Sequence, residues 1–318
     1  MEATASGNAR FAVLDCGTNT FNLLVAEPSG STFRVVHQAK IPVKLGKGGL
    51  KGRELKEEAI QRAEIAFKEF GEKLRVLKPD KVYISGTSAV RSARNGYRVQ
   101  EACLQHLGHP MHVIDGPQEA ELIFRGVMFS GVLDDLDSAL IVDIGGGSCE
   151  FIMYAHKAPV HMTSIEIGVS RLTDDFATFD FPHPDALDRM KFKLQETLRP
   201  LQAVVQEYRP SVLVGSSGTF DTFEDMLEAQ GLLMRREGNW SGYSENACAN
   251  LCEKLLDCDL EGRLRMPGIT AFRAEMLPAA AQLVLILLSM NSFKEVRTCH
   301  FAIKEGILFS LMHNKRLP

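Results

Sequence analysis

The chain has 318 residues, too many for one ordinary hydrophobic core, and this predicts two domains of roughly 150 residues each. Apolar residues make up 45% of the chain and charged residues 24%, as is typical of a soluble globular protein. The net charge of −4 at pH 7 argues against a general nucleic-acid binder, which needs a broad excess of positive charge.

The first ten residues are polar and lack the apolar stretch of a signal peptide, which favours a cytoplasmic protein. The longest apolar run, Leu277–Met290, is too short to cross a bilayer, so it predicts a buried helix and no membrane partner. Seven cysteines include no CxxC pair. Cys248 and Cys252 could share a helix face, but no histidine lies nearby to complete a metal site, so the cysteines are interpreted as ordinary thiols.

In the first half, Phe11–Ala26 (FAVLDCGTNTFNLLVA) predicts a β-hairpin, because an apolar strand enters a Gly turn and an apolar strand returns. A third strand is expected at Phe33–Ile41. The loop Val43–Arg53 that follows has four glycines and four basic residues. The remaining predictions are helices at Leu55–Leu77, Tyr97–Leu107 and Gln118–Ser130, strands at Lys81–Ser85 and His112–Ile114, and a turn at Gly86–Arg91.

After an acidic linker at Asp134–Asp137, the segment Ala139–Met153 (ALIVDIGGGSCEFIM) repeats the plan of the first hairpin. Its aspartate follows that of the first hairpin by roughly 130 residues, and VLVGSSGT echoes VYISGT at a similar offset, which indicates an internal duplication. Helices are predicted at Pro184–Glu207, Asp221–Gly231, Ser244–Leu256, Glu275–Met290 and Ile303–Met312.

The two Gly turns have the chemistry of an anion site. Gly145, Gly146 and Gly147 carry no side chains, so their backbone N–H groups can approach an anion closely, and Ser148 adds a hydroxyl. Asp143, just before the turn, is a candidate ligand of Mg²⁺, directly or through water. The same arrangement recurs in Asp15, Gly17, Thr18, Asn19 and Thr20.

A single Gly turn would favour a plain hairpin without a ligand, but an aspartate beside a Gly turn in both halves favours phosphate binding. The turns are not Walker loops, because no GK[ST] follows the glycines. Dinucleotide binding is also disfavoured, because GxGxxG is absent and strand–turn–strand is the wrong context for it.

Several segments resemble motifs of the exopolyphosphatase / guanosine pentaphosphate phosphohydrolase family, within the actin-like, hexokinase-like ATPase group. Residues 15–20 (DCGTNT) resemble its first phosphate motif, DxG[ST]N[ST], and residues 143–150 (DIGGGSCE) its second, DIGGGSxE. Residues 86–91 (GTSAVR) are similar to GTxxxR, residues 116–127 (GPQEAELIFRGV) to GxxEAxLIxxGV, and residues 304–308 (KEGIL) to REGxL.

The resemblance implies two duplicated ribonuclease H-like (actin-like ATPase) α/β domains with an inter-domain cleft, residues 1–124 plus about 303–318 and residues 125–302. It implies Mg²⁺-dependent hydrolysis, with Mn²⁺ as the alternative metal, that releases orthophosphate from inorganic polyphosphate or guanosine pentaphosphate. It also implies a homodimer. Glu119 is the implied general base; Asp15, Asp143 and Glu150 are the implied metal ligands.

Individual residues keep alternative interpretations. Glu119 could instead be a solvated first-turn glutamate, and only one of Glu119 and Glu121 can face the cleft, since they lie roughly 200° apart on a helix. Glu150 is equally a strand-edge carboxylate. Arg91 is a candidate phosphate ligand or a surface arginine. Gly218 belongs to a loop that could contact phosphates or merely join a strand to a helix.

Three departures from the motifs stand out. Gln118 replaces a usual Glu, Lys304 replaces the Arg of REGxL, and residues 273–275 (RAE) replace an RAD-like segment. We expect these departures to affect the rear of the second domain and the dimer contact more than the chemistry. Two other functions remain open: an ATP-dependent small-molecule kinase of the same superfamily, and a non-catalytic sensor of alarmones or polyphosphate.

Overall fold

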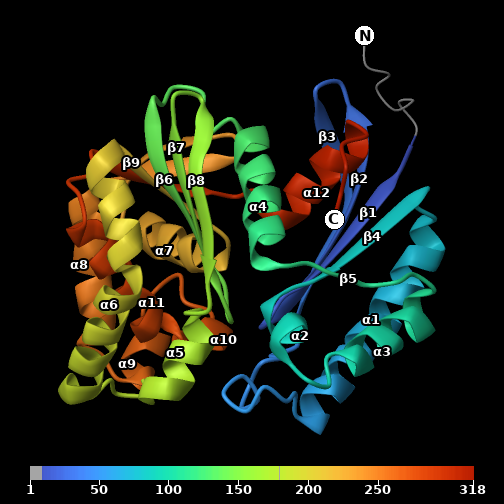
Figure 1. Cartoon of the computed structure of the whole chain (residues 1–318), viewed down its shortest axis with the longest axis horizontal. Helices are drawn as coiled ribbons and strands as arrows, with labels where there is room; N and C mark the ends of the chain where they lie inside the picture. Colours follow the sequence, from blue (N-terminus) through green and yellow to red (C-terminus); the bar gives the residue numbers. More distant parts are fainter. Residues whose placement is uncertain (1–8, 179) are drawn as a thin grey trace. The chain divides into compact units, whose positions relative to one another are not determined.

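The computed structural model describes residues 9–178 and 180–318 (Figure 1). The chain forms two compact units, one made of the residues up to Phe129 together with Ile303–Pro318 and the other of Ser130–Ala302. The sequence placed the first boundary at 124/125. The contacts place it at the end of a helix that runs to Ser130, so that helix stays with the first unit.

The first unit is built on a five-stranded sheet of order β3-β2-β1-β4-β5. The strands β1, β2 and β3 are antiparallel neighbours, whereas β4 is parallel to β1 and to β5. The strands are β1 (Phe11–Cys16), β2 (Thr20–Ser29), β3 (Thr32–Pro42), β4 (Lys81–Gly86) and β5 (His112–Val113). The helices are α1 (Glu57–Leu77), α2 (Ser88–Ser92), α3 (Tyr97–Leu107), α4 (Gly116–Ser130) and α12 (Ile303–Met312).

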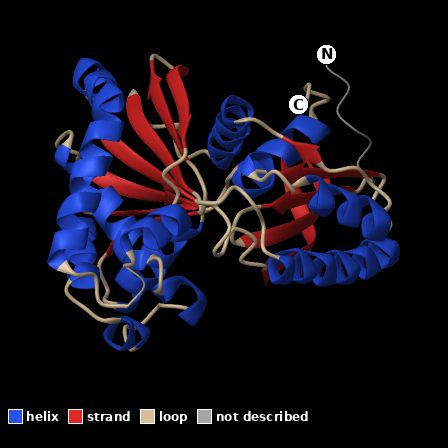
Figure 2. Ribbon diagram, turned by 60° about the horizontal axis from the view of Figure 1, so that its bottom comes forward, coloured by secondary structure: helices blue, strands red, loops and turns tan. Residues whose placement is uncertain are grey.

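Because successive side chains of β1 point to opposite faces of the sheet, the two faces pack against different helices. Ala12, Leu14 and Cys16 belong to the hydrophobic core formed with α1, where Phe21 stacks on Phe67 with ring centroids 5.2 Å apart. The intervening residues of β1 therefore point to the opposite face. The helix α12 packs on β1 and β2, and helices lie on both sides of this sheet in Figure 2.

The second unit has a seven-stranded sheet of order β10-β11-β12-β9-β6-β7-β8. The strands are β6 (Ser138–Ile144), β7 (Cys149–Ala155), β8 (Ala158–Ile165), β9 (Val212–Ser216), β10 (Leu233–Glu237), β11 (Trp240–Tyr243) and β12 (Glu295–Cys299). The helices are α5 (Val169–Phe176), α6 (Pro184–Tyr208), α7 (Gly218–Ala229), α8 (Glu245–Leu256), α9 (Leu260–Leu264), α10 (Ala271–Ala274) and α11 (Leu277–Ser289).

The two sheets repeat one plan, which confirms the predicted duplicated α/β fold. In each, a hairpin is extended by a third antiparallel strand on one side and by a parallel strand on the other. The order β3-β2-β1-β4-β5 thus corresponds to β8-β7-β6-β9-β12, and the second sheet adds β11 and β10.

Both hairpins lie where the sequence placed them, and the apolar run at 277–290 forms the buried helix α11. The predicted turn at 86–91 is wrong, because residues 88–92 form the one-turn helix α2. The predictions also lacked β8, α5, α9, α10 and the strands β10–β12. Within the described residues, no helix combines the length and apolarity that a membrane span requires.

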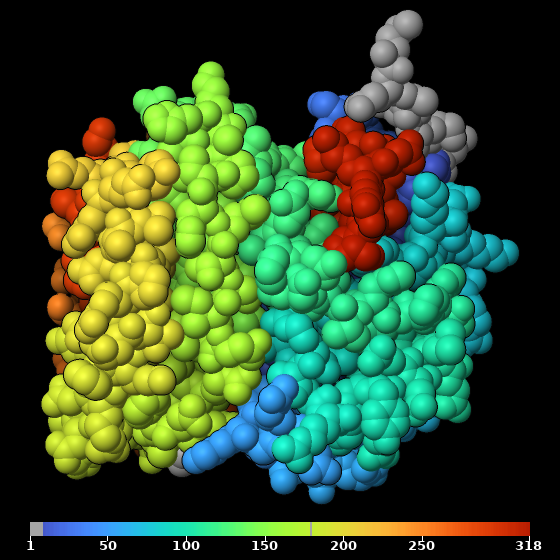
Figure 3. All heavy atoms as spheres, viewed as in Figure 1, coloured from blue at the N-terminus to red at the C-terminus, as the bar shows by residue number. Residues whose placement is uncertain are grey.

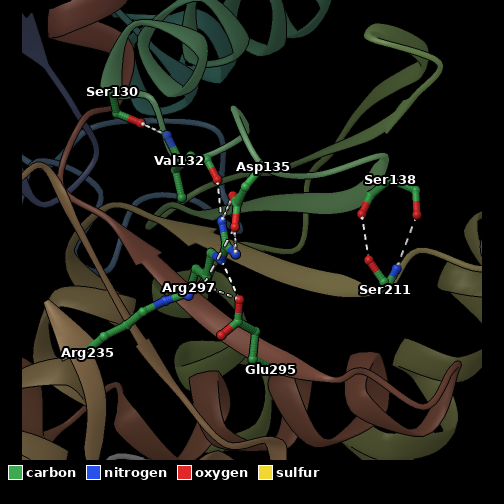
Figure 4. A network of polar contacts seen from close by, with 8 residues as sticks. All are labelled: Ser130, Val132, Asp135, Ser138, Ser211, Arg235, Glu295 and Arg297. Atoms are coloured by element: carbon green, nitrogen blue, oxygen red, sulfur yellow. Dashed lines mark hydrogen bonds and ion pairs between the residues drawn. The ribbon is translucent and has the colours of Figure 1, made fainter. Parts of the chain in front are cut away.

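The segment after α4, predicted as an acidic linker, is held inside the second unit by Arg297 of β12 (Figure 4). The buried guanidinium donates to the carbonyl of Val132 at 2.8 Å, to the Asp135 carboxylate at 2.8 Å and to Glu295 at 2.6 Å. It also lies over the Trp240 ring, 4.2 Å from its centroid. The start of the second unit is therefore fixed to the centre of its own sheet.

Candidate active site

The first Gly turn joins β1 to β2 as a tight loop. The N–H of Gly17 donates to the Thr20 carbonyl at 3.1 Å, and a Cβ on Gly17 would lie 3.0 Å from that oxygen. The carbonyl of Asn19 accepts from the N–H of Lys44 at 2.8 Å, and that of Thr18 accepts from the following loop at 3.0 Å. The basic loop 43–53 is thus attached to the back of the predicted phosphate loop.

Asp15 lies at the end of β1 on the face covered by α12. Asp15 is 9% exposed, and Ser85 donates to its carboxylate at 3.4 Å. Burial raises the pKa of Asp15 to about 6; the charge of Lys304 and hydrogen bonds from Asn22 and Ser85 oppose this rise, and Glu305 adds to it. Lys304 also pairs with Glu305 at 2.8 Å.

The expectation that Lys304 acts at the rear of the second domain is therefore wrong. Residues of α12 return to the first unit, and Lys304 supplies a positive charge near the carboxylate of Asp15. Asp15 and Lys304 are far apart in sequence, so no local pattern could predict that they lie close together. The KEGIL motif did mark the segment of Lys304 as one of interest.

Glu119 and Arg91 meet within the first unit. Nη1 of Arg91 donates to Oε2 of Glu119 at 2.8 Å and to the Ile114 carbonyl at 2.8 Å. Glu119 is 8% exposed, so this is a mostly buried ion pair. Glu121 instead pairs with Arg125 at 3.1 Å, as the angular separation of the two glutamates on α4 predicts.

The same helix explains the departure at position 118. The N–H of Asp115 donates to Oε1 of Gln118, and the N–H of Gln118 donates back to Oδ1 of Asp115, both at 2.8 Å. This reciprocal pair is a capping box, which accepts Gln as readily as Glu. The substitution therefore keeps the helix start that positions Glu119.

The second Gly turn repeats the geometry of the first, since the N–H of Gly145 donates to the Ser148 carbonyl at 3.1 Å. The carbonyls of all three glycines accept N–H groups from the start of α5, at 2.9 to 3.4 Å. In the described parts of the chain, the N–H groups of Gly146, Gly147 and Ser148 donate to no protein acceptor. The carbonyl groups of the turn are thus already hydrogen-bonded, whereas its N–H groups remain available to bind an anion.

Asp143 and Glu150 are register partners on β6 and β7, and their carboxylates are 7% and 1% exposed. Ser217 donates to Asp143 at 2.8 Å, and Ser164 donates to Glu150 at 2.7 Å. Carboxylate and hydroxyl oxygens are a donor set that suits Mg²⁺. No group of three His, Cys, Asp or Glu among the described residues could hold a metal, so such an ion would need water or phosphate oxygens as further ligands.

Gly218, at the start of α7, lies against the guanidinium of Arg273. A Cβ on Gly218 would lie 1.6 Å from Nη2 of Arg273, so a larger residue there would displace the guanidinium. Burial lowers the pKa of Arg273, and the charges of Asp221 and Asp225 oppose the shift. Arg273 therefore adds a desolvated cation beside the β9–α7 loop.

The predicted residues thus form two groups. The first unit holds Asp15, Gly17, Thr18, Asn19, Thr20, Arg91 and Glu119, and the second holds Asp143, Gly145, Gly146, Gly147, Ser148, Glu150 and Gly218.

Comparison with known proteins supports the resemblance drawn from the motifs. The model of the Ppx/GppA phosphatase family matches residues 24–315. An exopolyphosphatase from Cytophaga hutchinsonii is 32% identical over 96% of this chain and 99% of its own, with a TM-score of 0.90. A Ppx/GppA family member from Aquifex aeolicus is 21% identical over 96% and 98% of the two chains, and its TM-score of 0.78 shows the shared fold. The chain therefore belongs to the Ppx/GppA phosphatase family and is a phosphohydrolase.

Proposed function

We propose that the protein removes the terminal phosphoryl group of inorganic polyphosphate or guanosine pentaphosphate, with Glu119 as general base. The observation that carries this proposal is the buried Glu119–Arg91 pair, with 2.8 Å between Oε2 and Nη1, in the unit that also holds the first phosphate loop. A 32% identical structural relative is itself described as an exopolyphosphatase.

In this proposal each Gly turn binds phosphate oxygens of the substrate. The N–H groups of Gly146 and Gly147, which donate to no acceptor in the described chain, and the Ser148 hydroxyl would be donors for phosphoryl oxygens. Arg273, over the Gly218 loop, adds a cation whose burial strengthens its attraction for a phosphate.

Asp143 and Glu150 would hold Mg²⁺ on the second unit, directly or through water, and Asp15 is the candidate metal ligand of the first unit. Bound there, the metal ion would neutralise charge on the phosphate oxygens. Mn²⁺ accepts the same oxygen donors and is the alternative metal.

The guanidinium of Arg91 fixes the carboxylate of Glu119 so that it can accept a proton from the attacking water. As the oxygen of that water bonds to the terminal phosphorus, the bridging P–O bond breaks. Its electron pair stays on the oxygen of the shortened chain, and orthophosphate leaves. Lys304 would keep the neighbourhood of Asp15 less negative while the charged substrate is bound.

The basic loop 43–53 supports a polyanionic substrate. Its backbone is attached to the phosphate loop through Lys44, and to the end of α2 through Arg53, whose Nε donates to the Ser92 carbonyl at 3.2 Å. Lys47 and Lys51 are exposed on this loop, which contains no acidic residue. We expect the loop to attract phosphates that precede the reacting one.

The test is phosphate release from short polyphosphate, long polyphosphate and guanosine pentaphosphate, each with Mg²⁺, Mn²⁺ or chelator. The proposal expects orthophosphate release without an acceptor molecule and loss of that release with chelator. ATP-dependent phosphorylation of a small molecule would instead favour a kinase and would contradict the proposed hydrolysis. Binding of these polyanions without turnover would instead favour a non-catalytic sensor and would also contradict the proposed hydrolysis.

A further inference from the structure

A cavity of about 460 Å³ lies within the second unit, between α6 and α11. From α11 it is lined by Gln282, Leu285, Ile286 and Ser289, whose spacing of i, i+3, i+4 and i+7 places them on one helix face. From α6 it is lined by Leu187, Asp188, Lys191 and Gln195, which also share one face. The cavity is distinct from the residues of both Gly turns, and its size is that of a small-molecule site.

Gln282 is anomalous in this setting. It lies in the middle of the apolar segment LPAAAQLVLILLS, and its side chain is 7% exposed. Within the part of the chain that the structure describes, its carboxamide makes no hydrogen bond to the protein. The amide atoms of Gln282 are not fully enclosed by protein, so the carboxamide faces the cavity and is available to hydrogen-bond with an occupant.

The chemistry of the lining specifies the partner. A carboxamide presents a donor and an acceptor side by side, and Gln pairs in this way with the N6/N7 edge of adenine. Leu285, Ile286 and Leu187 provide aliphatic walls that suit the faces of a flat ring. Asp188 at the rim is an acceptor for sugar hydroxyls, as acidic residues are in nucleotide sites.

We propose that this cavity is a binding site for an adenine nucleoside, with the Gln282 carboxamide pairing with the N6/N7 edge of the base. The base lies between the α6 and α11 faces, and the ribose lies toward Asp188. The site is separate from phosphate hydrolysis, because a nucleoside carries no phosphate for the Gly turns.

The test measures binding of adenosine, guanosine, cytidine and uridine to the full chain by calorimetry and by ligand-observed NMR. We expect adenosine to bind with a Kd below about 1 mM and at least tenfold more tightly than the other three nucleosides. Saturating tripolyphosphate should leave this Kd unchanged. Equal binding of all four nucleosides, no binding of adenosine at 5 mM, or competition by tripolyphosphate would each overturn the proposal.

Two variants localise the site. Gln282→Leu keeps the size of the side chain and removes the carboxamide, and we expect it to weaken adenosine binding at least tenfold. Gln202→Leu makes the same chemical change at an exposed position of α6, outside the cavity lining, and should leave the Kd unchanged. Thermal unfolding of Gln282→Leu at or above the wild-type midpoint shows that the variant is folded. Unchanged adenosine binding by that folded variant would refute the site.

Discussion

Glu119 and Glu121 stand two positions apart on one helix, yet only Glu119 is buried against an arginine of the candidate site. We expect Glu119→Gln to lower kcat by about 10²- to 10⁴-fold with little change in KM, because the amide keeps the shape of the side chain but cannot take the proton. The measurement is steady-state phosphate release from short polyphosphate.

Glu121→Gln is the matched control for that variant, because it makes the same chemical change on the same helix at the residue that pairs with Arg125. Its activity should stay within about twofold of wild type, since exposed ion pairs contribute little. Near-normal kcat in folded Glu119→Gln, or an equal loss in both variants, would reject Glu119 as the base.

A second residue-scale prediction concerns His300. Its Nε2 lies 2.7 Å from Oε2 of the buried Glu224, which also pairs with Arg236 at 2.8 Å. The hydrogen bond and charge of Glu224 raise the pKa of His300, with Asp221 adding to the rise and burial and Arg236 opposing it. Protonated His300 is therefore favoured in the folded chain.

Because the folded pKa of His300 is the higher one, its contribution to the free energy of unfolding is fully present below the unfolded value of 6.5. That contribution is lost as the pH rises through the folded pKa. Denaturant unfolding between pH 6 and 9 should show this decline in wild type and a flatter profile in His300→Gln. His109→Gln should retain the wild-type slope; an identical slope in His300→Gln would contradict the role of the pair.

At the scale of elements, the strand–turn–strand pattern with a Gly turn sufficed to place both hairpins. It failed for β12, because the strand Glu295–Cys299 buries Glu295 and Arg297, whose charges are neutralised only by partners elsewhere in the chain. The helix α2 spans five residues, too short for helical periodicity to show. Elements whose pattern depends on distant partners could not be predicted locally.

The candidate site divides in the same way. Each Gly turn was predictable, because its glycines and aspartate are consecutive. The ion pair of Arg91 with Glu119 and the approach of Lys304 to Asp15 join separate elements, so motifs could suggest the residues but not their contacts. The position of Arg273 over Gly218 depends on packing of α10 against the β9–α7 loop, which no periodicity encodes.

The element-scale prediction concerns the basic loop. The double variant Lys47→Ala/Lys51→Ala should raise KM for long polyphosphate by about tenfold at low ionic strength with kcat unchanged, because attraction by exposed charges acts on binding. The effect should shrink as salt is added. The variant Lys68→Ala/Lys73→Ala removes the same charge from the exposed side of α1 and should leave KM unchanged. If both double variants raised KM equally, the net charge of the protein rather than the basic loop would be responsible.

At the scale of the molecule, the two units differ in chain continuity. The second unit, Ser130–Ala302, is one continuous segment with its own hydrophobic core, and Arg297 ties its first residues to its sheet. The first unit is discontinuous, because α12 returns from the end of the chain to pack on β1. The buried side chains of Ile307 and Leu308 belong to that contact surface.

This difference predicts how fragments behave. The fragment 130–302 should unfold cooperatively on heating, because its core and its buried ion pairs are complete. The fragment ending at 129 should lack a cooperative transition, since without α12 it exposes apolar surface of β1 and α4. At Gly306 a Cβ would lie 1.8 Å from the Leu122 carbonyl, so α12 and α4 fit together only through a glycine.

Adding the peptide 303–318 to the fragment ending at 129 should restore a cooperative transition by circular dichroism, whereas the same peptide carrying Gly306→Val should not. A cooperative transition in the fragment ending at 129 alone would show that α12 is dispensable for the first unit. Its role would then be confined to bringing Lys304 close to Asp15.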